Sequence, residues 1–312
     1  MDALVIKKAN AMPAPTWSWL KMNETKVAVP AGLERDCQVV IENAGDLLET
    51  HASFEGAVEK LQQRVDARRG DDADTRAILR AAQGHDAGAS DLDTPALSSY
   101  EKKVALSQIA GDVAADFETG VGRDARAYLN FLAGGTAVLA TEPGDEASAT
   151  VRVSARPGTS SSASIDVVAA EDSELDLAIS IDAACGADQA AFAGSALRVF
   201  AGERSRVNVT VYLTCGAGVT CVEDSGFVLD DDARVTVRHV VLGGSFTATG
   251  LAADLRGDRS RIDIDTSYLG AGADERDFNY IVRHRGKKTE CNLDANGVLT
   301  GTSKKILRGT ID

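Results

Sequence analysis

The 312-residue sequence is poor in aromatic side chains, at 5%, and contains only six prolines and five cysteines. Its apolar runs stay well short of the roughly 20 residues that a membrane-spanning helix needs. The hydrophobic share of 44% and the charged share of 26% are those of a packed globular protein rather than a disordered chain. In Met1–Asn10 a short apolar stretch is followed by Lys7 and Lys8, with no cleavage site after them. We therefore expect no signal peptide and a cytoplasmic protein.

Acidic residues outnumber basic ones: the sequence has 47 Asp and Glu and 33 Lys and Arg, which gives a net charge of −14. Such a surface repels phosphate backbones and anionic lipid headgroups. We expect neither nucleic acid nor membrane as a partner.

Signatures of several enzyme classes are missing. The sequence has no GxxxxGK[ST] phosphate loop, no GxGxxG opening a strand–helix unit and no GxSxG. The chain is therefore not itself an ATPase, and we expect no catalytic residue and no enzymatic activity.

The cysteines are odd in number and scattered, at Cys37, Cys185, Cys215, Cys221 and Cys291. In a cytoplasmic protein they are expected as reduced thiols, and no CxxC or four-ligand zinc pattern is present. Cys215 and Cys221 flank the turn 216–220. Because thiolates prefer iron and other soft metals, two thiols on adjacent strands could hold a metal-cluster intermediate or a persulfide. The competing interpretation for this pair and for Cys291 is that the cysteines are buried and chemically inert. The same interpretation applies more strongly to Cys185.

The pattern of the chain changes near residue 135. Helical spacing of apolar residues predicts helices over Phe54–Gln63, Asp74–Gln83 and Leu97–Ala115, with a loop at Gly84–Asp93. We expect an N-terminal helical region over 1–134, with an extended arm that carries Trp17 and Trp19. These indoles either pack the arm onto the body or contact a partner.

After residue 135 apolar and polar residues alternate, as in strands. One short unit recurs, with a polar turn, a small residue and alternating apolar residues. Its copies are Gly144–Val151, Ala170–Leu177, Gly202–Val209, Asp230–Val237 and Gly257–Ile264, with the small residues Ala147, Ser173, Ser205, Ala233 and Ser260.

Each unit is a turn feeding a strand that cannot bury its own apolar face, so stacked coils must bury it together. Coils of this length hold two or three short strands. The sequence therefore predicts a mainly β protein, a parallel β-helix or β-solenoid over 135–312. A propeller blade needs a longer repeat, and a sandwich does not require repeated turns.

The residues from 197 to 312 resemble the SufB/SufD family of the Suf iron–sulfur cluster assembly system. The resemblance is carried by FAGERSRVNVTVY (200–212), ARVTVRHVVLGG (233–244), LRGDRSRIDIDTSYL (255–269), DFNYIVRH (277–284), Thr289 and GVLTGTSKKILRGTID (297–312). The N-terminal PTWSWLKMNE resembles the arm of the SufD branch, which we favour over SufB.

The resemblance implies a right-handed parallel β-helix with helical regions at both ends. It also implies a complex of SufB-like, SufD and SufC ATPase subunits, in which the SufB–SufD pair is the scaffold for the cluster. In the family, more strands and a helical segment follow the R-G-x-I motif. Because the sequence stops there, we expect the family's SufC surface and cluster ligands to be missing, and we transfer none of them. We expect no firmly bound cofactor, and an iron–sulfur cluster only in the assembled complex.

Two histidines are metal candidates beside the cysteines. His284 stands where the family often has a histidine before a short turn and Thr289. The competing interpretation is a turn histidine that bonds the backbone of a neighbouring coil. His239 follows Arg238, and the two should point to opposite faces of their strand, one into the interior and one to the surface. For His239 the competing interpretation is a capped edge of a coil.

The alternative function is a β-helix carbohydrate-active enzyme or an adhesin. Asp263 and Asp265 should share one strand face and could form an acidic ladder with Asp230–Asp232 on an outer groove. The competing interpretation is a solvated face. A third hypothesis is a stand-alone assembly module that forms a homodimer through its sheet edges.

Overall fold

The computed structural model describes residues 4–14, 19, 22–48, 54–69 and 117–312. They fall into two units. Residues 4–48 and 117–312 belong to the first unit, and the helix α1 is the described part of the second. The predicted helix at Phe54–Gln63 is confirmed by α1, whereas the predictions for Asp74–Gln83, Gly84–Asp93 and Leu97–Ala115 lie outside the described residues.

The described elements, in chain order, are β1 (Val5–Ala9), β2 (Thr25–Ala28), β3 (Glu34–Arg35), β4 (Gln38–Glu42), the 3-10 turn η2 (Gly45–Leu47), α1 (Phe54–Arg69), α4 (Arg123–Ala133), β5 (Ala137–Ala140), β6 (Glu146–Ser154), β7 (Thr159–Ala169), β8 (Glu174–Ala183), β9 (Ala191–Ala201), β10 (Arg206–Cys215), β11 (Val219–Leu229), β12 (Arg234–Val241), β13 (Phe246–Leu255), β14 (Arg261–Gly270), β15 (Glu275–His284), β16 (Glu290–Leu299) and β17 (Lys304–Ile311).

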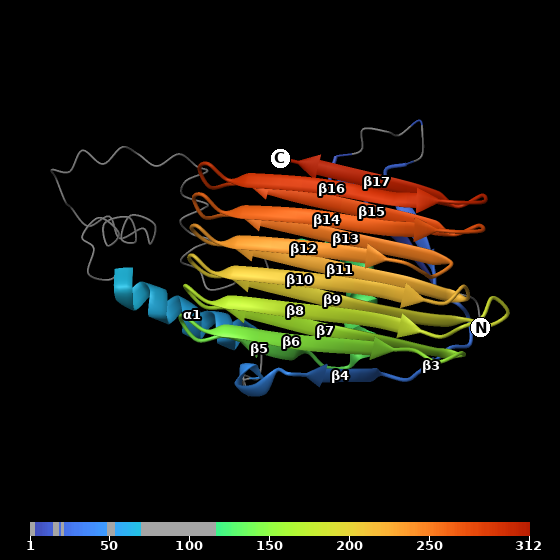
Figure 1. The fold of residues 1–312 in the computed structure, drawn as a ribbon, viewed down its shortest axis with the longest axis horizontal. Helices are drawn as coiled ribbons and strands as arrows, with labels where there is room; N and C mark the ends of the chain where they lie inside the picture. The colour runs from blue at the N-terminus through green and yellow to red at the C-terminus, as the bar shows by residue number, and fades with distance from the viewer. Residues whose placement is uncertain (1–3, 15–18, 20–21, 49–53, 70–116) are drawn as a thin grey trace, which may run out of the picture. The chain divides into compact units, whose positions relative to one another are not determined.

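From β6 onward the chain alternates between two sheets (Figure 1). The seven-stranded sheet has the order β16-β14-β12-β10-β8-β6-β4, and the eight-stranded sheet has the order β17-β15-β13-β11-β9-β7-β3, with β5 also paired to β7. Successive strands within each sheet are parallel, apart from β4. Each coil thus contributes one strand to each sheet. The predicted parallel β-solenoid is confirmed, with about 6 turns.

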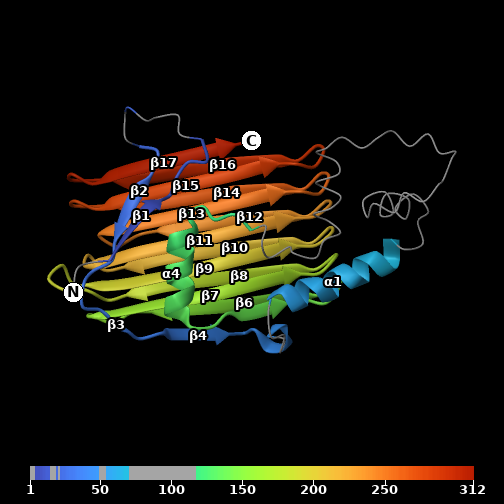
Figure 2. The same ribbon diagram turned by 180° about the vertical axis from the view of Figure 1, so that it is seen from behind.

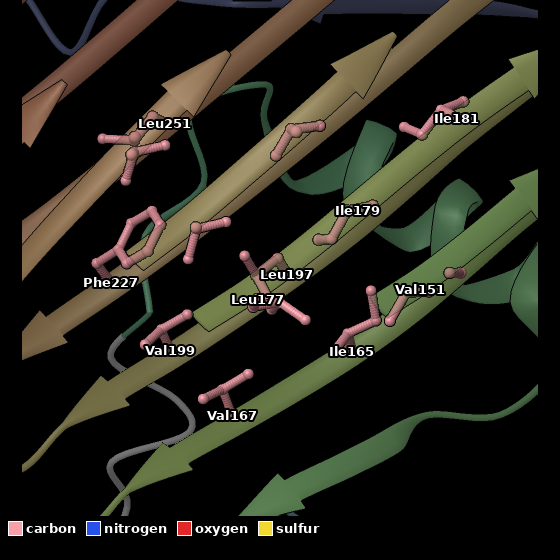
Figure 3. Packing of buried hydrophobic residues seen from close by; sticks show 14 of the residues in the cluster. Val151, Ile165, Val167, Leu177, Ile179, Ile181, Leu197, Val199, Phe227 and Leu251 are labelled. Carbon is pink, nitrogen blue, oxygen red and sulfur yellow. The ribbon is translucent and has the colours of Figure 1, made fainter. Parts of the chain in front are cut away.

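The space between the two sheets is filled by stacked apolar columns (Figure 3). In one column Leu175 pairs in register with Val207, which pairs with Val235 and through it with Ile262. All four are fully buried. Val, Ile and Leu suit these positions because branched side chains pack well on a pleated surface. Burial of roughly 25 cal/mol per Å² of apolar area stabilises the stack.

The repeat is confirmed except in its first copy. Strand register aligns the positions 146, 174, 206, 234, 261 and 290 of successive coils. Ser173, Ser205, Ala233 and Ser260 each lie one residue before this position, as predicted. Ala147 does not, because it pairs with Leu175 inside the sheet, so the prediction for Ala147 is wrong by two residues. Spacing alone cannot reveal such a shift, since a slip of two residues keeps every side chain on the same face.

The turns that enter the seven-stranded sheet share a left-handed residue. It has positive φ and stands two positions before the aligned strand start, at Gly144, Asp172, Arg204, Asp232, Arg259 and Lys288. Non-glycine residues rarely adopt this conformation. Here neighbouring coils place opposite charges side by side: Arg204 makes a bidentate ion pair with Asp172, at 2.6 and 2.7 Å, and Arg259 makes one with Asp232.

The outer face of the eight-stranded sheet is covered by other parts of the same unit. Helix α4 lies across β7, β9 and β11, and the β1–β2 hairpin lies beside it (Figure 2). Arg126 of α4 holds the buried Asp224 of β11 at 2.5 Å, and Asp224 also accepts the N–H of Val121 at 3.0 Å. Buried Asn10 donates to Asp277 of β15 at 2.6 Å. These polar contacts fix the arm and α4 on the sheet.

Within the described part of the first 134 residues, the helical region is minor. Among the described residues of the first 134, β1 to β4 are strands, and the described fold is mainly β. Strand β4 shows why part of this region is extended rather than helical. It runs antiparallel to β6 and places Val39 opposite Val153 and Ile41 opposite Val151. Its pairing covers the first edge of the seven-stranded sheet, which would otherwise expose unpaired backbone groups. Short segments of this kind depend on their partner strand and carry little signal of their own.

The backbone of 120–121 crosses β13 so closely that Gly250 has no room for a side chain. A Cβ at Gly250 would lie 2.2 Å from the nitrogen of Val121. We predict that Gly250→Ala lowers the free energy of unfolding by about 1–3 kcal/mol through overpacking. Chemical denaturation followed by circular dichroism measures it.

The matched control is Gly309→Ala in β17, because a Cβ there meets nothing within 4 Å. It should be neutral or stabilise by up to about 1 kcal/mol, since alanine restricts the unfolded chain. Equal effects of the two substitutions would contradict the close crossing at Gly250.

Candidate functional site

Two of the predicted thiols meet inside the solenoid. Cys215 ends β10 and Cys221 lies in β11, and their Sγ atoms are 2.9 Å apart with Cys221 as the donor. Both are free cysteines. Cys221 is fully buried, whereas Cys215 keeps 7% of its surface exposed. The hydrogen bond to Cys215, together with burial, raises the pKa of Cys221 well above its ordinary value.

A buried arginine stands beside this pair. The side chain of Arg276 in β15 is fully buried; it donates to the carbonyl oxygens of Gly244, at 2.7 Å, and Leu269, at 3.0 Å, and to the carboxylate of Asp274, at 2.9 Å. Burial lowers the pKa of Arg276, and Asp274 and the two thiols act in the opposite direction. The guanidinium is thus a fixed positive charge next to the sulfur atoms.

Further along the interior, acidic, basic and hydroxyl groups gather. Glu223 Oε2 of β11 lies 3.3 Å from Nε2 of His239 in β12, and both side chains are fully buried. Tyr280 stacks on His239, with ring centroids 5.8 Å apart, and its hydroxyl lies 3.3 Å from His239 Nδ1 and 2.7 Å from Thr266 Oγ1. Ser225 donates to the second carboxylate oxygen of Glu223.

Several polar atoms in this region have no hydrogen-bond partner among the described residues. Glu223 Oε2 and His239 Nε2 are within ion-pair range but not aligned for a hydrogen bond. Ser195 and Thr249, the strand neighbours of Glu223 in β9 and β13, each leave a buried hydroxyl oxygen unpaired. We call the set of interior polar side chains the interior polar cluster; its members are Ser195, Cys215, Cys221, Glu223, Ser225, His239, Thr249, Thr266, Arg276 and Tyr280.

Unpaired buried polar atoms are costly, so their concentration in one stretch of an otherwise apolar interior marks a functional candidate. The cluster offers two soft thiols, a carboxylate, an imidazole and a phenol. Within the part of the chain that the structure describes, no three His, Cys, Asp or Glu side chains are grouped closely enough to hold a metal. The thiols of Cys215 and Cys221 are therefore a pair rather than a complete ligand set.

The other candidates lie apart from this cluster. His284 Nδ1 is 2.7 Å from Thr289 Oγ1 across the turn after β15. Cys291 of β16 pairs with Ile262 and is half-buried, and burial raises its pKa. Cys185 is buried in a turn, where burial also raises its pKa. Exposed Cys37 lies 3.3 Å from the carbonyl oxygen of Ser162.

Trp19 is 75% exposed, so the expectation that it packs onto the body is wrong. Trp17 lies outside the described residues. A partner contact by both tryptophans stays a prediction.

The acidic ladder is held by arginines. Arg261 binds Asp263 through both carboxylate oxygens, at 2.8 and 2.9 Å, and this contact lowers the pKa of Asp263. Asp232 is held by Arg259, while Asp265 projects from the same exposed face of β14 as Asp263. The predicted sharing of one face is confirmed.

Sequence reasoning found Cys215, Cys221 and His239 but missed the remaining members of the interior polar cluster. Strands β11 and β15 are buried on both faces over nearly their whole length. Their sequences therefore lack the apolar–polar alternation that identifies an inward face. The one available signal is the spacing of Cys221, Glu223, Ser225 and Phe227, which must share a face once the strand is known.

Fold and interior together define a parallel two-sheet solenoid with a polar stretch in its core. A family model described as SUF system FeS cluster assembly, SufBD core domain, matches residues 151–312. The match covers more than half of the chain, from within β6 to the end of β17, and the chain belongs to the SufBD family. No curated protein matches the sequence.

The family serves iron–sulfur cluster assembly in the SUF system, and its members generally work with SufC and other Suf proteins. It is an assembly family rather than a known enzyme family. Among the described helices, none is both long and apolar enough to cross a bilayer.

Burial raises the pKa of Tyr280 far above its ordinary value near 10. Below pH 10 the tyrosine is protonated in both folded and unfolded chains. Above that pH only the unfolded chain releases the proton, so the contribution of Tyr280 to stability is lost as pH rises. Tyr280→Phe removes this dependence. We predict that the stability gap between wild type and Tyr280→Phe narrows between pH 9 and about pH 11.

Urea unfolding at each pH measures the gap. Tyr212→Phe is the control, because Tyr212 is 42% exposed on β10. Its gap to the wild type should stay constant across the same range. A gap for Tyr280→Phe that stays constant or widens would contradict the burial of the neutral phenol.

Proposed function

We propose that this protein is a scaffold subunit of a SufBCD-type complex and supports iron–sulfur cluster assembly without catalysing a reaction by itself. The observation that carries the proposal is the family match over 151–312, which covers the strands of successive solenoid coils. In this proposal the partners are a SufB-like subunit and the SufC ATPase, in the cytoplasm. The arm PTWSWLKMNE favours the SufD position.

The cluster is cargo of the complex rather than a resident cofactor of this chain. Biological clusters are usually held by four cysteine thiolates. Cys215 and Cys221 supply at most two, and their Sγ atoms face each other in the interior. The proposal therefore assigns the remaining ligands to the assembled complex.

The carbohydrate alternative gains no support from the acidic ladder. Two of its carboxylates, Asp232 and Asp263, are each held by an arginine on the same face of the solenoid. A carboxylate with its oxygens occupied in this way is a structural element of the surface.

Co-expression of the tagged chain with the SufB-like subunit and SufC of the same genome tests the proposal. We expect the SufB-like subunit to be retained on the affinity resin, SufC to be retained through it, and the three chains to elute together in size-exclusion chromatography. The chain alone should show no ATP hydrolysis and no cleavage of acidic polysaccharides. Retention of neither subunit would refute the scaffold role, and polysaccharide cleavage would favour the alternative.

Trp19 offers a sharper prediction within this experiment. Because 75% of its surface is exposed, Trp19→Ala should leave the melting temperature unchanged. As an aromatic anchor it should weaken capture of the SufB-like subunit about tenfold, in titrations followed by biolayer interferometry. Trp17→Ala should act in the same direction.

Phe131→Ala is the matched control, since Phe131 is 66% exposed on α4 and lies outside the arm. It should leave capture unchanged. Equal binding by Trp19→Ala and wild type would show that the arm is not part of the interface. The scaffold proposal would then still be decided by the co-expression experiment.

A further inference from the structure

We propose that Cys215 and Cys221 form a redox-responsive dithiol, which a hydroperoxide converts to an intramolecular disulfide. Their Sγ atoms are 2.9 Å apart, and a disulfide needs about 2.0 Å. The two sulfur atoms must therefore approach by about 0.9 Å for the bond to form. The inference rests on this geometry and is independent of the assembly role.

The two cysteines are held together by the coils on both sides. The turn between them begins at Gly216, where a Cβ would lie 2.2 Å from the carbonyl oxygen of Cys185 in the preceding coil. In the following coil, a Cβ at Gly243 would lie 1.9 Å from the carbonyl oxygen of Cys215. The turn between the two cysteines is thus packed closely against the turns of the preceding and the following coil. The backbone at Cys215 therefore cannot shift without moving the coils on both sides.

The thiols differ in access and in hydrogen bonding, which assigns the order of the reaction. Cys215 is buried but keeps 7% of its surface exposed, and it accepts the hydrogen bond, whereas Cys221 has no exposed surface and donates it. The guanidinium of Arg276 lies near the pair, because it donates to the carbonyl oxygen of Gly244, and a Cβ at Gly244 would lie 3.5 Å from Cys221 Sγ. Cys215 is therefore the sulfur that meets an oxidant, and Cys221 is the sulfur that resolves the product.

The chemistry balances in two steps. The Cys215 thiolate attacks one oxygen of hydrogen peroxide, so that an S–O bond forms, the O–O bond breaks, and hydroxide leaves and takes up a proton as water. The sulfur of Cys221 then attacks the Cys215 sulfenic acid. An S–S bond forms, the S–O bond breaks, and the second water carries away the proton of Cys221. The thiols lose two electrons in total, and the peroxide gains them.

In a reducing compartment such a disulfide forms transiently and is reversed by other thiols. The product would join the end of β10 to the beginning of β11 within the interior polar cluster. Oxidation would also remove the hydrogen-bond donor of Cys221.

A single peptide reports the reaction. Trypsin releases residues 207–234 as one fragment that contains both cysteines and no internal Lys or Arg. The folded full-length chain is treated with hydrogen peroxide, then quenched, unfolded, alkylated with N-ethylmaleimide and digested. We expect this fragment to lose both maleimide labels and two hydrogen atoms, while the fragment with buried Cys185 keeps its label. Dithiothreitol should restore both labels.

Single substitutions separate the two roles. In Cys221→Ser, Cys215 should stop at the sulfenic acid and be trapped by dimedone. In Cys215→Ser, Cys221 should take up no dimedone, because it is fully buried. Cys185→Ser is the matched control and should oxidise like the wild type.

The wild-type result decides the inference even if a variant fails to fold. Retention of both labels on the 207–234 fragment, at a peroxide concentration that oxidises exposed Cys37, would overturn it. Loss of labels to bonds between separate chains, seen on non-reducing gels, would overturn it as well. Equal dimedone trapping at Cys221 in Cys215→Ser would overturn the assigned order.

Discussion

Hydrogen bonding between parallel strands of successive coils is the constraint on which the rest of the structure depends. Each strand takes its register from the coil before it, so that position 174 meets 206, and 206 meets 234. Once this register is set, each inward side chain lies beside the inward side chains at the equivalent positions of the neighbouring coils. Apolar columns then bury each other, and any polar residue at an inward position meets its neighbours at fixed distances. The interior polar cluster is a product of this stacking, because Ser195, Glu223 and Thr249 are consecutive members of one column.

The two sheets solve different problems. The seven-stranded sheet has one face in the core and one in solvent, so buried residues alternate with more exposed ones along its strands, as in β10. The eight-stranded sheet is covered on its outer face by α4 and the N-terminal hairpin. Polar residues on that outer face serve as attachment points, and Arg308 illustrates this: it pairs with buried Asp277 at 2.5 Å and donates to the backbone of Met22. A charge pair removed from water in this way is costly to break because either partner alone would be buried uncompensated.

This difference explains how much of the molecule the sequence could predict. Leu175, Val207 and Val235 alternate with exposed polar residues, so β8, β10 and β12 and the coil repeat were predictable from period-two spacing alone. Strands β11 and β13 were not, because both of their faces are buried and their sequences show no period. Of the candidate site, the proximity of Cys215 and Cys221 follows from a short turn between two strands, and the inward side of His239 follows from alternation. The approach of Tyr280 to His239 depends on residues 41 positions apart and on a pairing between sheets that no local pattern encodes.

The charged turns have a consequence for how such a chain can grow or shrink. Left-handed positions carry Asp172, Arg204, Asp232 and Arg259 in consecutive coils, so acid and base alternate along the edge of the solenoid. Deleting the single coil that begins at Arg204 would set Asp172 against Asp232, with two like charges on turns of an uncommon backbone conformation. Deleting that coil and the next would bring Asp172 to Arg259 and restore the alternation. In this stretch, insertion or loss of two coils at a time therefore preserves the alternation of charges along the edge. A single coil is still the repeating unit of the backbone.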